Sequence, residues 1–204
     1  MTLPLFDIPH PSPPPDAEAT SPATVKAAAA PVQYVAWLGS LVHTHQYGKL
    51  ADLRRPPTAD SPTHYEARAF APNEDDRGLY RQVGFLFARY HAGRVKPHYG
   101  YGDMGRAIRS IGYDGARGPA NPGAERLMMR ILPARHIPWR HLQHAIERIR
   151  AGATTPPSWA ELITDLTQWT DRGRPTPEKW GDAFYSRSRS RTPSPTAPTN
   201  GATT

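Results

Sequence analysis

The sequence contains no cysteine, which excludes disulfide bonds, thiol catalysis and zinc sites built from cysteine. It also contains no run of about 18 apolar residues, so no segment is expected to span a membrane. The first 30 residues lack the unbroken apolar core of a secretion signal, because several prolines and Asp7 interrupt it. We therefore expect a cytoplasmic protein, and 204 residues with 38% hydrophobic content suffice for one or two folded cores.

Acidic residues are scarce in only one part of the chain. Residues 81–150 carry thirteen Lys and Arg against four Asp and Glu, a net charge of +9, while the whole chain has +7. Residues 31–80 carry five cations and six anions, and residues 151–186 carry three and five. Twelve of the thirteen cations are arginine, whose guanidinium binds phosphate oxygens in pairs and stays charged. The middle of the chain thus indicates a polyanionic partner.

Apolar residues recur three and four positions apart, and no segment alternates apolar and polar residues as a half-buried strand does. The spacing predicts helices over approximately these ranges: 32–46, 48–55, 62–70, 77–90, 104–111, 122–131, 139–149, 159–169 and 176–184. The predicted fold is therefore all-α.

Capping signals support several of these helix starts. Asn121 followed by Pro122 predicts a cap and a first-turn proline. Ser158 with Glu161 three residues later predicts a capping box, in which each residue satisfies a backbone N–H of the other. The five tryptophans lie at the spacing of core residues, which favours core packing over base stacking.

Both ends are predicted to be disordered. Residues 1–30 contain seven prolines and an alanine run, a composition that buries too little apolar surface to offset its ordering entropy. Residues 187–204 begin with alternating arginine and serine, which indicates a solvated tail with loose affinity for nucleic acid.

The arginines of the middle segment lie beside the apolar stripes. Arg106 and Arg109 flank an apolar pair, Arg126 and Arg130 are one turn apart, and Arg140 lies off its helix stripe. Each alone is typical of a solvated helix face. Such a face normally mixes signs, however, and here only four anions are present to balance the cations, so the set together indicates a binding surface.

Residues 100–105 match the pattern G-x-G-x-x-G and precede a predicted helix. No buried strand comes before them, so a dinucleotide-binding βαβ unit is not expected. A smaller role stays open, in which the backbone amides of this loop hold a phosphate beside Arg106 and Lys96.

Catalytic and metal sites are not evident. His141, His144 and Glu147 are three residues apart, but the H-E-x-x-H spacing is absent, which favours histidines that face solvent or nucleic acid over a metal site. We find no nucleophile with a base and no carboxylate pair, so neither an enzyme nor a cofactor is expected.

The order of several segments resembles the small subunit, the CasB family, of Cascade, the type I-E CRISPR interference complex. The first segments that carry the resemblance are 34–38, 50–55 and 80–93. It continues through residues 104–108, 125–130, 142–146, 159–162 and 180–185, and so covers residues 31–186 in the expected order.

The resemblance implies two packed helical bundles, which we place at residues 31–116 and 117–186. It implies no catalytic site and no cofactor. It also implies that the chain dimerises within the complex, contacts the backbone and large subunits, and helps to hold crRNA paired with the target DNA strand and the displaced strand. Base pairing would read the sequence, while the protein would stabilise the R-loop through backbone contacts.

By position, the resemblance and the charge pattern predict ten nucleic-acid-binding residues: Arg54, Arg55, Arg94, Lys96, Arg106, Arg109, Arg126, Arg130, Arg135 and Arg140. Two alternatives stay open. One is a free-standing architectural protein that binds DNA or RNA independently of sequence, and the other is a nucleotide-dependent enzyme that uses the glycine-rich loop.

Overall fold

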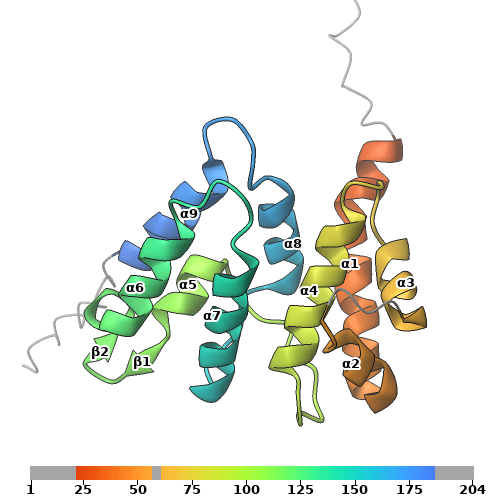
Figure 1. Ribbon diagram of the computed structural model, residues 1–204, viewed down its shortest axis with the longest axis horizontal. Coiled ribbons are helices and arrows are strands. Elements are labelled where there is room, and N and C mark those ends of the chain that lie inside the picture. The colour runs from red at the N-terminus through yellow and green to blue at the C-terminus, as the bar shows by residue number, and fades with distance from the viewer. Residues whose placement is uncertain (1–21, 57–60, 187–204) are drawn as a thin grey trace, which may run out of the picture.

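The computed structural model describes residues 22–56 and 61–186 (Figure 1). The described elements are α1 (Pro22–His43), α2 (Tyr47–Leu53), α3 (Pro62–Ala69), α4 (Arg77–Tyr90), α5 (Met104–Arg109), β1 (Gly112–Tyr113), β2 (Ala116–Arg117), the 3-10 helix η1 (Gly118–Ala120), α6 (Pro122–Ile131), α7 (Trp139–Ala151), α8 (Trp159–Thr167) and α9 (Pro175–Tyr185). The all-α prediction is confirmed. In the described ranges no helix has the length and apolar character needed to cross a bilayer.

Helix α1 begins earlier than the sequence predicted. Residues 22–30 were assigned to a disordered head, but they form the first turns of this helix. Pro22 occupies the first helical position, where its missing N–H costs nothing, and the alanines at 27–30 are the strongest helix formers. The predicted disorder of residues 1–21 and of the tail at 187–204 lies outside the described residues.

A small hairpin between α5 and α6 was not predicted. Gly112 pairs with Arg117, and Tyr113 pairs with Ala116, in an antiparallel register. The two residues between the strands are Asp114 and Gly115, a pair typical of tight hairpin turns, and Gly115 has a φ of 89°. Strands of two residues each leave the fold class unchanged.

The helices form two groups that lie side by side along the long axis of the molecule (Figure 1). The α1 group consists of α1, α2, α3, α4 and α8, and the α5 group consists of α5, α6, α7 and α9. Contacts between α4 and α7 join the groups. Each group takes helices from both predicted ranges, 31–116 and 117–186, because α8 packs on α1 and α4 while α5 packs on α9. The division of the chain into two bundles stays a prediction.

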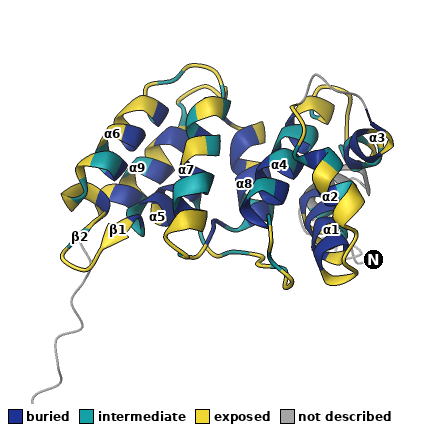
Figure 2. Cartoon of the chain, turned by 60° about the horizontal axis from the view of Figure 1, so that its bottom comes forward, coloured by how far each residue is buried: buried dark blue, intermediate teal, exposed yellow. Residues whose placement is uncertain are grey.

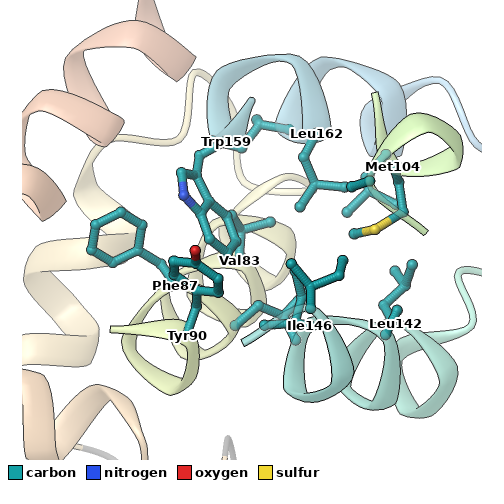
Figure 3. Packing of buried hydrophobic residues seen from close by; sticks show 14 of the residues in the cluster. Val83, Phe87, Tyr90, Met104, Leu142, Ile146, Trp159 and Leu162 are labelled. Atoms are coloured by element: carbon teal, nitrogen blue, oxygen red, sulfur yellow. The ribbon is translucent and has the colours of Figure 1, made fainter. Parts of the chain in front are cut away.

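Buried apolar side chains make one continuous core through the junction of the groups (Figure 3). Phe87 of α4 and Trp159 of α8 meet edge to face with ring centroids 5.2 Å apart. Ile146 of α7 belongs to the same buried cluster (Figure 3). Trp159, Trp169 and Trp180 are fully buried, which confirms the core role predicted for them, whereas Trp37 and Trp139 are only partly buried. The core therefore holds the α1 group and the α5 group together.

His91, at the end of α4, is a buried polar group in this junction. Its Nδ1 donates to the carbonyl oxygen of Phe87 at 2.9 Å, and its Nε2 accepts from the backbone N–H of His98 at 2.9 Å. Burial lowers the pKa of His91 to about 4. The ring is thus neutral near pH 7, with both nitrogens satisfied.

Candidate nucleic-acid interface

Several arginines of the basic segment bind acceptors within the protein, and four of them support the packing of the helices or the hairpin. Arg89 pairs with Glu147 across the junction between α4 and α7. Arg117 pairs with Asp114 in the hairpin at 2.8 Å, and Arg150 donates to the carbonyl oxygen of Ala92 at 2.8 Å. The fourth, Arg148, lies against the cap of α6. None of the four is among the ten predicted site residues.

The start of α6 shows how these structural arginines position the others. The Asn121 side chain accepts from the backbone N–H groups of Gly123, at 3.1 Å, and Ala124, at 3.0 Å, so the predicted cap is confirmed. The same oxygen accepts from Arg148 of α7 at 3.4 Å. A Cβ at Gly123 would lie 2.6 Å from the Arg148 guanidinium, so a larger residue there would displace the end of the Arg148 side chain. The contact fixes α6 against α7.

The outer surface of this helix pair carries a concentration of positive charge. We call it the α6–α7 face and define it as Arg126, Arg130, Arg140, His141 and His144. Figure 2 shows that exposed residues gather on the outer sides of α6 and α7. The three arginines are exposed, and in the described part of the chain none of them pairs with a carboxylate. Partial burial and then the charges of Arg130 and Arg140, with a smaller effect of His144, lower the pKa of His141. The face can therefore offer its charge to a polyanion.

Glu147 does not join His141 and His144 in a metal-binding arrangement. Its carboxylate accepts from Gln143 at 3.0 Å and pairs with Arg89 of α4. Partial burial opposes ionisation, but these two hydrogen bonds lower the pKa of Glu147 below its usual range. Among the described residues, no three His, Asp or Glu side chains gather as metal ligands.

Arg54 and Arg140, far apart in the sequence, line the same cavity. This α2–α7 pocket has a volume of about 420 Å³ and lies between the end of α2, the middle of α4 and the start of α7. Phe85 and Trp139 also line it. Arg55, next to Arg54, is exposed and lies 3.7 Å from Asp52. The pocket continues the positive charge of the α6–α7 face toward the α1 group.

Three other predicted residues lie apart from this pocket. Arg94 stacks its guanidinium over the Tyr90 ring, 4.5 Å from the centroid. Lys96 is exposed in the loop after α4, and Arg135 is exposed in the loop between α6 and α7.

Arg106 and Arg109 lie in a different environment, which we call the α5 cleft. This cavity of about 610 Å³ is also lined by Asp103 and Glu161, so it contains both signs of charge. The Arg106 guanidinium lies 4.5 Å from the centroid of the Tyr101 ring, and Arg109 donates to the Ser186 hydroxyl at 2.6 Å. The cleft is therefore a weaker site for a polyanion than the α6–α7 face.

The two acidic groups of the cleft, Glu161 of α8 and Asp103 before α5, each have a partner within the protein. Glu161 pairs with Lys179 at 2.7 Å, and Lys179 also pairs with the buried Asp165 at 2.7 Å. Burial opposes protonation of Lys179, but hydrogen bonds to Asp165 and Glu161 raise its pKa. Burial raises the pKa of Asp103, which caps α5 by accepting from the N–H of Arg106 at 2.8 Å.

The glycine-rich loop at 100–105 serves packing. A Cβ at Gly100 would lie 1.8 Å from the carbonyl oxygen of Pro157, and one at Gly105 would lie 2.0 Å from that of Trp180. The N–H of Tyr101 donates to Pro156 at 3.1 Å, and that of Arg106 is taken by Asp103. These two amides are already satisfied, which counts against the phosphate role, and the described sheet is only a two-stranded hairpin.

The capping box predicted at α8 is half formed. The Ser158 side chain accepts from the N–H of Glu161 at 3.4 Å, as predicted. The Glu161 carboxylate binds Lys179 instead of returning to Ser158, whose own N–H donates to Gly102 at 2.8 Å. A long-range ion pair has replaced the second half of the local motif.

Sequence reasoning missed two features of these sites. The spacing of Trp139 predicts a core residue, yet Trp139 lines the α2–α7 pocket. The one sequence feature that could indicate this role is its position directly before Arg140 at the start of a helix. Asp165 was not singled out, although its carboxylate accepts from Lys179 and from the Trp180 indole at 2.6 Å, and its carbonyl accepts from Thr176 at 2.8 Å. No local pattern marks a carboxylate that will be buried.

The fold and the α6–α7 face define an all-α protein whose surface suits a polyanion. The family model for CRISPR-associated protein Cse2 matches residues 49–185, from within α2 to the end of α9. The chain belongs to this family and is a small subunit of the type I-E CRISPR complex Cascade. No curated protein and no solved structure matches it.

Proposed function

We propose that the chain is a non-catalytic Cascade subunit that binds the nucleic-acid backbone and stabilises the R-loop. Its ligands would be the paired target strand with crRNA and the displaced DNA strand, and its protein partners the backbone and large subunits and a second copy of itself. The observation that carries the proposal is the α6–α7 face, where exposed arginines lack carboxylate partners within the described ranges. Guanidinium groups in this state bind phosphates without reading bases.

The other predicted residues are expected to contribute to nucleic-acid binding to different extents. Arg54 joins the face through the α2–α7 pocket. We assign Arg55, Arg94, Lys96 and Arg135 to weaker contacts at its margins, because no cavity groups them with the face. Arg106 and Arg109 would contribute least, because the α5 cleft contains carboxylates.

A triple variant tests the face directly. Changing Arg126, Arg130 and Arg140 to alanine should weaken binding of single-stranded oligonucleotides of any sequence to a similar degree. The slope of log affinity against log salt should fall in magnitude by about 0.7 for each phosphate of the single strand that is no longer bound. R-loops formed by the assembled complex should dissociate faster.

The matched control removes three arginines elsewhere, Arg68, Arg77 and Arg172, so that the net charge change is the same. Equal reductions in affinity for both variants would reduce the effect to overall charge and would contradict the assignment of the face. Purification from the native host distinguishes the alternative class: crRNA and other subunits should accompany the chain, whereas a free-standing architectural protein would purify without them.

A further inference from the structure

The α2–α7 pocket combines arginines with aromatic and amide side chains. Trp139 at the start of α7 and Phe85 of α4 line it, both partly buried, and Gln82 of α4 lines the same cavity. Its volume of about 420 Å³ lies within the range of about 300–1,000 Å³ that is usual for small-ligand sites. A surface that binds phosphates by charge alone would not need a cavity of this size.

The arginines of the pocket differ in their availability. Arg89 is committed, because it pairs with Glu147 and lies 5.6 Å from the centroid of the Phe85 ring. Arg54 and Arg140 form no ion pair with any carboxylate in the portion of the chain that the structure describes. Two guanidinium groups can thus bind one phosphate, while Phe85 is already covered on one side and Trp139 is the better surface for a flat ring.

Trp139 and Gln82 each line two cavities of opposite charge. The second of these cavities, of about 500 Å³, is also lined by Asp75 and Asp76. A phosphate is repelled by these carboxylates and attracted by Arg54 and Arg140. The electrostatics therefore orient a ligand so that its anionic part lies in the α2–α7 pocket.

We propose that this pocket binds one unpaired nucleotide of a nucleic-acid strand. The phosphate lies between Arg54 and Arg140, and the base stacks on Trp139. The Gln82 amide provides a donor and an acceptor, which suits the edge of any base. The inference rests on the proposed function but adds a contact to the base itself, one that tolerates every sequence because each base has a flat face.

Abasic strands test the stacking contact. The full-length protein is titrated, at one fixed salt concentration, with a short single strand and with the same strand in which all nucleotides are abasic. Removal of the stacked base should weaken binding by about tenfold, since the backbone charge is unchanged. The Trp139→Leu variant should bind both strands with equal affinity, and Trp139→Phe should keep most of the difference. Arg140→Ala should weaken both strands alike.

Deoxyribose and ribose strands are both used, and a difference between intact and abasic strands in either one supports the pocket and identifies the sugar it accepts. Equal affinity of the wild-type protein for intact and abasic strands in both series would overturn the pocket while leaving backbone binding in place. Failure to bind any strand would overturn the proposed function together with this inference. The wild-type comparison needs no variant, so it stands even if Trp139→Leu does not fold.

Discussion

The α6–α7 face and the α5 cleft are both rich in arginine, yet they differ in what surrounds those arginines. On the face, Arg130 and Arg140 have no carboxylate partner among the described residues. In the cleft, Arg106 shares its cavity with Glu161, which comes from α8 and is distant in sequence. The contrast teaches that charge must be counted in space, because folding brings acids into a segment that contains few.

The largest expected effect comes from removing the support of the cleft. Asp165→Ala leaves the buried Trp180 indole N–H without an acceptor and removes one of the two carboxylates that pair with Lys179. Lys179 is exposed and keeps Glu161 as a partner, so most of the loss comes from the buried Trp180 N–H, and the free energy of unfolding should fall by about 2–4 kcal/mol. Chemical denaturation measures it. Asp171→Ala, at an exposed loop position, is the control and should change stability by less than about 0.5 kcal/mol.

A second test concerns His91, which is buried in the junction between the α1 group and the α5 group. The folded-state pKa of His91 is about 4, lowered from 6.5 by burial, so between these pH values only the unfolded chain binds the proton. The contribution of neutral His91 to the free energy of unfolding is complete above pH 6.5 and is lost as the pH falls toward 4. The loss should amount to roughly 3 kcal/mol.

Carboxylates also titrate in this pH range and change the stability of any variant. The effect of His91 is therefore measured as the difference in stability between two proteins. Denaturation of the wild-type protein and of a His91→Gln variant is compared across that window. The stability advantage of the wild-type protein should shrink as the pH falls. An advantage that stays constant would show that His91 protonates equally in both states.

The cleft should become more like the face when it loses an acid. Glu161→Gln keeps the shape of the side chain but removes its charge from the cavity. Oligonucleotide affinity should rise, with a salt slope steeper by at most about one. Glu178→Gln, on the exposed side of α9, is the matched control for net charge and should have a smaller effect. Equal increases in affinity for Glu161→Gln and Glu178→Gln would mean that the charge of Glu161 does not weaken the attraction of Arg106 and Arg109 for phosphate.

The smallest expected effect is a pH dependence of the face itself. Burial and neighbouring cations lower the pKa of His141, and a bound phosphate should raise it again. Binding therefore takes up protons, and affinity should increase severalfold at most as the pH falls below about 6.5. Titrations at several pH values, repeated with His141→Gln, measure this change. A variant with the same pH profile as the wild type would remove His141 from the binding surface.

Local chemistry predicted much of the fold and part of the site. The cap at Asn121 and the helix periodicities were predictable because they depend on neighbours within one or two turns. The pairing of Glu161 with Lys179, the burial of Asp165 and the exposure of Trp139 to a cavity depend on which helices pack together. The spacing of residues along the sequence does not determine which helices pack together, so these features could not be predicted. The early start of α1 is not evident from composition, because the many prolines of residues 1–30 indicate disorder while the alanine run favours a helix.

Helices α5 and α8 each pack in the group formed mainly by the other sequence range, 117–186 or 31–116, and this affects how the protein unfolds. Helix α5 packs on α9 near the other end of the described chain, and α8 returns to α1 and α4. Neither sequence range can unfold without removing a helix from the group formed mainly by the other range, so denaturation should follow a single cooperative transition, with one slope that reflects the surface of the whole described core. Fragments cut between residues 116 and 117 would each lack partners for an apolar helix and should aggregate rather than fold.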